Sequence, residues 1–102
     1  MRLFADDLEQ VLKGNLEFWK KDHHASLAYI ILCDQLSKVI HRGSAKAYSF
    51  DPFAQKLARQ IINDKSRYKK YRFFERLTIL MPLIHSEFIR DVEVSLKEFE
   101  EL

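Results

Sequence analysis

The chain has 102 residues and a formal net charge of +2, which fits one small domain and does not indicate a nucleic-acid or membrane partner. Its two glycines and two prolines are few for an all-β fold with many tight turns, whereas 47% hydrophobic residues are enough for a core. We therefore expect residues 1–102 to form a single all-α domain.

Cys33 is the one cysteine of the chain and lies in the apolar run LAYIILC, so a disulfide framework is excluded and a buried thiol is expected. No signal-peptide pattern is present, and no apolar run reaches the ~20 residues that a membrane span needs. These features predict a soluble protein of the reducing cytoplasm.

The first half of the chain predicts two helices. Apolar residues recur at helical spacing over residues 3–21, with a kink expected at Gly14. A run that is apolar nearly all round predicts a buried helix over about residues 26–41. We expect Ser26 to cap its start and Gly43 to take the left-handed conformation after its end.

The second half predicts three more helices, joined by short loops that favour antiparallel neighbours. Asp51 and Pro52 form a typical helix start, with an acid at the N-cap and proline at the first turn. One apolar stripe of this helix comprises Phe53, Ala54, Leu57, Ala58, Ile61 and Ile62. Residues 63–71 are expected to be a polar connection.

A fourth helix is expected over residues 72–81, because Pro82 stops or kinks a helix. The last helix is expected over residues 86–101, with Ser86 as its N-cap and Glu87 in its first turn. Its apolar face is expected to comprise Phe88, Val92, Leu96 and Phe99.

Several polar residues fall where the pattern predicts burial. Asp34 and Gln35 lie in the most apolar helix, where an ionised carboxylate needs a partner such as Arg42, Arg76 or His85. Either a structural ion pair or a ligand-binding carboxylate fits this pattern, and we favour the structural pair.

Two further positions carry the same ambiguity. Glu75 and Arg76 lie among apolar residues, so partial burial in a structural network is expected. In the stretch IHSE, Ser86 and Glu87 are explained by a helix start, which leaves His85 as a candidate general base or ligand. The spacing His-Ser-Glu matches no metal motif, so neither a metal site nor a cofactor is predicted.

A basic stretch lies at residues 65–72 and is interleaved with Tyr68 and Tyr71. Its basic residues are Lys65, Arg67, Lys69, Lys70 and Arg72. Such a stretch can hold single-stranded nucleic acid, but we interpret it as a solvated loop because the C-terminal KEFEEL is acidic.

The stretches LAYIILCDQLSKVIHRGSAKAYSFDPFAQKLA and ERLTILMPLIHSEFIRDVE together resemble a bacterial family catalogued as a domain of unknown function, number nine hundred and twenty-four in its series. The resemblance implies an all-helical fold of the tetratricopeptide-like superfamily, with no established activity. The motif positions of the family fall on Asp34, Gln35, Arg42, Gly43, Asp51, Glu75, Arg76, His85, Ser86, Glu87 and Glu93.

The chain departs from the family pattern in sequence and in length. Lys38 and Val39 stand where the family has Arg-Asn, and Val92 replaces the glutamine of an Asp-Gln-Glu motif. Segments carrying a Trp-Phe motif and a Phe-Pro-His-Arg-Asn motif are missing, so the chain resembles a truncated member. We therefore expect exposed apolar surface, which invites a protein partner or self-association, including exchanged helices.

The leading hypothesis is a tetratricopeptide-like array of about five antiparallel helices that acts as a non-catalytic scaffold or protein-interaction module. The alternative is a small-molecule binder or enzyme with a polar site around Asp34, Arg42, His85 and Glu87. Nucleic-acid binding through residues 65–72 is the third hypothesis.

Overall fold

The computed structural model describes the backbone of residues 2–102 and the side chains of residues 5–102. Every regular element in that range is helical, so the expectation of an all-α fold is confirmed. The α-helices are α1 (Arg2–Leu12), α2 (His23–Ile31), α3 (Ser37–Ile40), α4 (Asp51–Asn63), α5 (Lys65–Lys69), α6 (Phe73–Ile84) and α7 (Ile89–Glu100). Two 3₁₀-helices, Glu17–Lys21 and Ala45–Tyr48, and a π-helical turn, Leu32–Leu36, lie between them.

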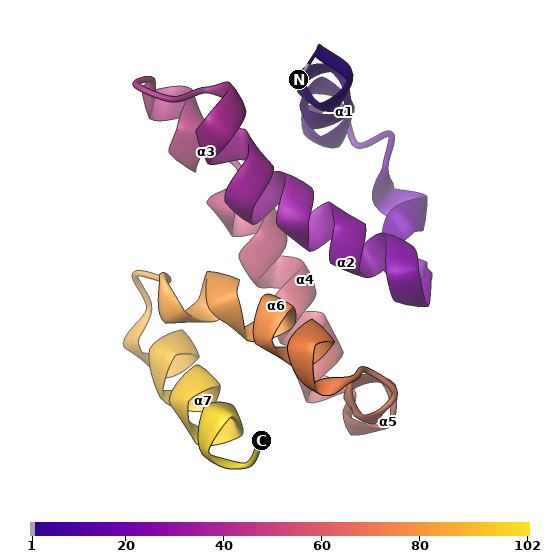
Figure 1. Cartoon of the computed structure of the whole chain (residues 1–102), viewed down its shortest axis with the longest axis vertical. Coiled ribbons are helices and arrows are strands. Elements are labelled where there is room, and N and C mark those ends of the chain that lie inside the picture. Colours follow the sequence, from indigo (N-terminus) through magenta and orange to yellow (C-terminus); the bar gives the residue numbers. More distant parts are fainter. Residues whose placement is uncertain (1) are drawn as a thin grey trace.

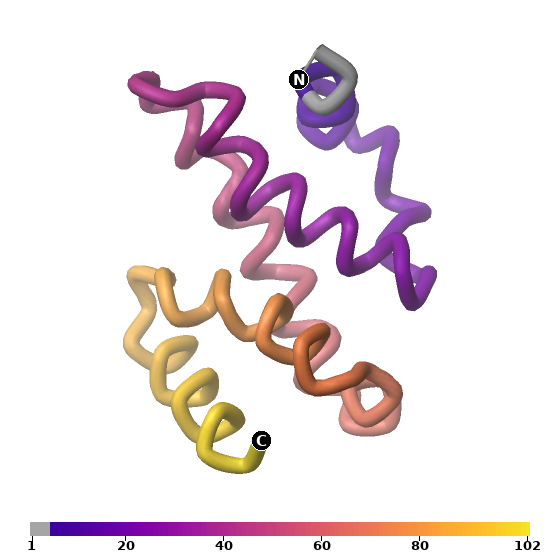
Figure 2. The backbone as a smooth tube through the Cα atoms, viewed as in Figure 1, coloured from indigo at the N-terminus to yellow at the C-terminus, as the bar shows by residue number. Residues whose placement is uncertain are grey.

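The helices form an array that measures 37 × 27 × 20 Å (Figures 1 and 2). α2, the π turn and α3 make one continuous rod that packs on α4; α6 runs back along α4, and α7 returns beside α6 (Figure 1). α1 contacts the π turn and α3, so α1 and α7 lie at opposite ends of the array. The helices in residues 2–102 are all too short or too polar to cross a membrane.

The core centres on α4. Four residues of its predicted stripe, namely Ala54, Leu57, Ala58 and Ile61, are fully buried, because α2 and α6, which also contact each other, both pack on α4. Burying a leucine or isoleucine side chain stabilises the fold by about 1.5–3 kcal/mol. The two alanines let neighbouring helices approach closely.

The N-terminal region differs from its predicted form in two ways. Residues 3–21 are not one kinked helix, because Gly14 takes φ +76° and a turn separates α1 from the 3₁₀-helix. Ser26 is not the N-cap of α2: Asp22 is, and its Oδ2 accepts a 2.7 Å hydrogen bond from the Ala25 N–H. The Ser26 hydroxyl is buried and donates to the Lys20 carbonyl at 2.9 Å.

The long second helix contains a π-helical turn that periodicity did not predict. Residues Leu32–Leu36 are wound with one extra residue per turn, and the Ser37 hydroxyl donates to the Cys33 carbonyl at 2.7 Å. Gly43 takes φ +80°, as expected after the helix end.

The prediction of α4 is off by one residue at its cap. The N-cap is Phe50, and Asp51 is the first helical residue, with its carboxylate on Lys38 instead of on the helix backbone.

The polar stretch 63–71 is also more ordered than expected. It contains α5, whose N-cap Asp64 accepts from the Arg67 N–H at 3.1 Å. Counting the continuous rod as one, the described residues hold six helices where five were expected, and α5 is the additional one.

The C-terminal boundaries also differ. Pro82 does not stop α6, which continues to Ile84, and α7 begins at Ile89 instead of Ser86. Ser86 still organises this start, because its Oγ accepts from the Phe88 N–H at 3.1 Å. The predicted apolar face of α7 is wrong in part: Phe88 and Leu96 are exposed, and Asp91 is buried.

Candidate functional site

The structure divides the predicted polar residues among three places. Asp34, His85, Ser86 and Glu87 lie together where the π turn, the start of α4 and the 85–88 turn meet. Gln35 and Arg42 are exposed. Arg42 lines a separate shallow hollow together with Tyr48. Glu75 and Arg76 lie at the start of α6, away from the other predicted residues.

A groove of about 630 Å³ runs between the start of α4 and the 85–88 turn. This polar groove is lined by Tyr48, Asp51, Pro52, Gln55, Arg59, His85, Glu87 and Phe88. Its volume lies in the range of small-molecule sites, and its wall combines two aromatic rings with groups of both charges.

Asp34 is the buried acid nearest to the groove. It is 5% exposed, and its Oδ1 lies 4.0 Å from His85 Nδ1 and 3.8 Å from Lys38 Nζ. Among residues 5–102 no donor makes a hydrogen bond to this carboxylate. Burial raises the pKa of the Asp34 carboxyl, and the charges of Lys38 and His85 offset only part of that effect.

Lys38 joins the π turn to α4. Its Nζ lies 2.5 Å from Asp51 Oδ1 and also donates to the Asp34 carbonyl at 2.7 Å. Lys38 Nζ lies closer to Asp51, at 2.5 Å, than to the Asp34 carboxylate, at 3.8 Å, so it neutralises Asp34 only in part. His85 is exposed, so the pair that it forms with Asp34 is reached from the solvent side.

A second ion pair contains Arg59, which lines the groove. Arg59 on α4 donates to both carboxylate oxygens of Asp91 on α7, at 2.8 and 2.7 Å, and the Ser86 hydroxyl donates to Asp91 at 2.6 Å. These hydrogen bonds, those from Arg59 above all, hold the pKa of the Asp91 carboxyl below its usual range. Asp91 thus ties α7 and the 85–88 turn to α4.

Glu75 and Arg76 have local partners. Glu75 Oε1 accepts from the Arg72 N–H at 2.7 Å, which completes a capping box at the start of α6. Arg76 donates to the Lys69 carbonyl at 3.0 Å and lies 5.2 Å from the centre of the Tyr68 ring. Both side chains are half-buried, as expected.

The tyrosines of the basic stretch are unavailable for stacking on bases. Tyr68 is 8% exposed and Tyr71 is 2% exposed, so both rings belong to the core. Arg67 is also turned inward, where it donates to the Ser26 hydroxyl at 2.7 Å and to the Lys20 carbonyl. The other basic side chains of the stretch are exposed to solvent.

Sequence reasoning did not assign Lys38, Asp51, Arg59 or Asp91 to the candidate site. Arg59 and Asp91 are 32 residues apart, and no local spacing links them. One signal was present: Asp91 stands on the buried side of an amphipathic helix, where an acid needs a cation.

One group of side chains could hold a metal ion. His23, His24 and Glu75 place a ring nitrogen of each histidine and a carboxylate oxygen within 4.8 Å of one another. No metal-binding role was predicted for the two histidines, because Glu75 lies about fifty residues away in the chain.

Comparisons with known proteins extend these findings. A search of curated proteins finds no match. One solved structure, described as a protein of unknown function, ATU0120 from Agrobacterium tumefaciens, superimposes with a TM-score of 0.85 and 24% identity. The match covers 96% of this chain and 55% of that one, so the chain spans about half the length of this relative. At this identity the similarity shows the fold alone.

The model of a family described as "Bacterial protein of unknown function (DUF924)" matches residues 1–102. The match extends over the whole chain, including the acidic, basic and histidine positions on which the resemblance rests. The chain therefore belongs to the DUF924 family of bacterial proteins of unknown function.

Proposed function

We propose that this protein is a protein-interaction module that binds an amphipathic helix of another polypeptide along α7. The observation that carries this proposal is the exposure of large apolar side chains there: Phe88 is 64%, Ile89 76% and Leu96 51% exposed. Clustered exposed apolar residues of this size are typical of interaction surfaces.

The spacing of the apolar residues suits a helical partner. Ile89, Val92, Leu96 and Phe99, which we call the α7 stripe, recur with steps of three, four and three residues, the pattern of a coiled-coil seam. Phe99 packs against the core, and Val92 is half-buried, whereas Ile89 and Leu96 face solvent. One edge of the α7 stripe therefore packs against the core, and the other edge is exposed to solvent, where a partner helix can bind.

Charge beside the stripe favours a basic partner over a second copy. Glu93 and Glu100 are exposed and flank the stripe on its solvent side. An antiparallel pair of α7 helices from two copies would bring these acidic flanks face to face, and like charges there are destabilising. A helix with lysine or arginine beside its apolar seam meets the same surface without repulsion.

Two designed peptides test the proposal. Both form amphipathic helices with the same leucine seam, and one carries lysines beside it while the other carries glutamates. In fluorescence anisotropy we expect the lysine peptide to bind and the glutamate peptide to bind at least tenfold more weakly. Leu96→Glu should abolish binding.

The matched control is Val39→Glu, because Val39 is 47% exposed on α3 and lies outside the stripe. It should leave peptide binding unchanged. The proposal is wrong if neither peptide binds, if both bind alike, or if the two variants have the same effect. It is also wrong if sedimentation shows a dimer that Leu96→Glu dissociates, because a second copy would then be the partner.

The second candidate function is small-molecule binding in the polar groove. It is favoured by the Asp34 carboxylate, which is buried behind His85 without a hydrogen bond and stands in a π-helical turn, a feature common at functional sites. Its test is a thermal-shift screen with nucleotides, amino acids and carboxylic acids. A binder should stabilise the wild type and not His85→Ala, and that variant should still bind the lysine peptide.

A further inference from the structure

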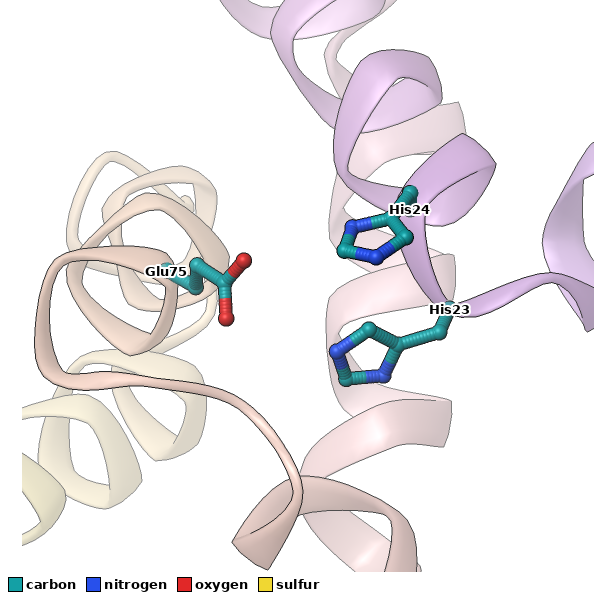
Figure 3. A group of neighbouring side chains, drawn as sticks. All are labelled: His23, His24 and Glu75. Atoms are coloured by element: carbon teal, nitrogen blue, oxygen red, sulfur yellow. The ribbon is translucent and has the colours of Figure 1, made fainter.

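His23, His24 and Glu75 bring three metal-binding side chains to one place outside the groove and the α7 stripe. The two histidines are the first residues of α2, and Glu75 is in the first turn of α6. Figure 3 shows both imidazole rings and the carboxylate pointing into the same space between these helix starts. The candidate ligand atoms all lie within 4.8 Å of one another.

Local contacts hold two of the three side chains in this orientation. The His23 ring stacks on the Tyr71 ring at 4.0 Å with an angle of 11°, and the Tyr71 hydroxyl donates to the His23 carbonyl at 3.0 Å. The Arg72 N–H holds Glu75 Oε1, while Oε2 receives no hydrogen bond from residues 5–102. His24 is exposed and free to adjust.

The donor set selects a class of metal. Two imidazoles and one carboxylate suit zinc and neighbouring transition metals, whereas magnesium and calcium prefer oxygen ligands alone. Ligands on one tetrahedral zinc at ~2.0–2.1 Å lie roughly 3.4 Å apart, so these atoms need to close by about 1.4 Å at most. Rotation of the exposed His24 side chain and a small movement of Glu75 supply that change.

We propose that His23, His24 and Glu75 bind a divalent transition-metal ion of the zinc class, with one coordination position left to water. The bound ion joins the start of α2 to the start of α6, two segments about fifty residues apart in the chain. It therefore ties the two helices that pack on α4 to each other at one end.

The experiment uses Zn²⁺ and Co²⁺ on the full chain. We expect one equivalent of Zn²⁺ by isothermal titration calorimetry, a rise in the melting temperature, and visible absorption when Co²⁺ binds. His24→Ala should weaken Zn²⁺ binding at least tenfold without affecting the fold, because the side chain is exposed. Glu75→Gln should do the same while its amide keeps the capping box.

His85→Ala is the matched control, because it removes another exposed histidine, which lies at the opposite end of α6 from Glu75. It should leave the Zn²⁺ affinity unchanged, and Mg²⁺ should not bind in place of Zn²⁺. The proposal is overturned if the wild type takes up no Zn²⁺ or if His24→Ala and Glu75→Gln bind it like the wild type. Equal loss in His85→Ala also overturns it.

Discussion

Replacing Asp91 by alanine tests whether the ion pair with Arg59 holds α7 to the rest of the fold. Asp91 is 7% exposed and accepts three hydrogen bonds, two from Arg59 and one from Ser86. The substitution leaves the guanidinium without its partner and frees the 85–88 turn. We therefore expect a marked loss of stability.

The magnitude follows from how far each partner is buried. Breaking a fully buried ion pair costs about 3–5 kcal/mol, whereas an exposed pair is worth about 0–1 kcal/mol. The Arg59 side chain is 35% exposed, so water can solvate its guanidinium once Asp91 is gone. An intermediate cost of about 2 kcal/mol results, which lowers the melting temperature of a domain of this size by roughly 8–16 °C.

Thermal and urea unfolding followed by circular dichroism measure this loss. The control is Glu93→Gln, which changes an exposed acid on the same helix and should shift stability by less than about 0.5 kcal/mol. If Asp91→Ala unfolds like Glu93→Gln, the pair does not hold α7 and the reasoning is refuted.

The same comparison has a defined pH dependence. The pKa of Asp91 is lower in the folded chain than in the unfolded one. The contribution of the Asp91 charge to the free energy of unfolding is therefore complete above the pKa of the unfolded chain, ~3.9, and is lost as pH falls through the lower pKa of the folded chain. The stability difference between the wild type and Asp91→Ala should narrow in acid.

Three further outcomes are expected. Burial raises the pKa of Asp34, so ionising its carboxyl lowers the free energy of unfolding as pH rises through the folded pKa. In urea unfolding at pH 7, Asp34→Asn should therefore be at least as stable as the wild type. A loss of more than about 1 kcal/mol would contradict this. Burial raises the pKa of the Cys33 thiol to about 12, so Ellman's reagent should react with it only in denaturant. Rapid reaction of the native protein would show that Cys33 is not buried in the core. Gly14 has φ +76° and open space around it, so Gly14→Ala should lower the free energy of unfolding by about 1–2 kcal/mol through backbone strain alone. An unchanged melting temperature would show that the turn tolerates a side chain.

Local signals in the sequence were sufficient for much of the fold. The start at Asp51 and Pro52 and the stripe through Leu57 and Ile61 identified α4, because periodicity and capping act within a few residues. The same signals misplaced the caps at Ser26 and Ser86. At each position a tertiary partner, Arg67 or Asp91, holds the hydroxyl.

Less of the candidate site than of the fold could be predicted from the sequence. Contacts such as Arg59 with Asp91, or Glu75 with the two histidines, depend on how helices cross, and no spacing along the chain encodes that. His85 was one of three candidate partners predicted for Asp34, because both are polar residues in apolar stretches, and the two side chains lie 4.0 Å apart.

The π-helical turn also determines how the chain tolerates a change in length. The π turn contains one residue more than a turn of α-helix, so deleting one residue from Leu32–Leu36 gives a regular α-helix and leaves the residues after it at nearly the same rotation. Lys38 would then still face Asp51. The same deletion in a regular α-helix would rotate everything after it by about 100°. This segment should therefore tolerate the loss of one residue, and homologues without the extra residue should keep the partner of the Asp51 position on the same helix.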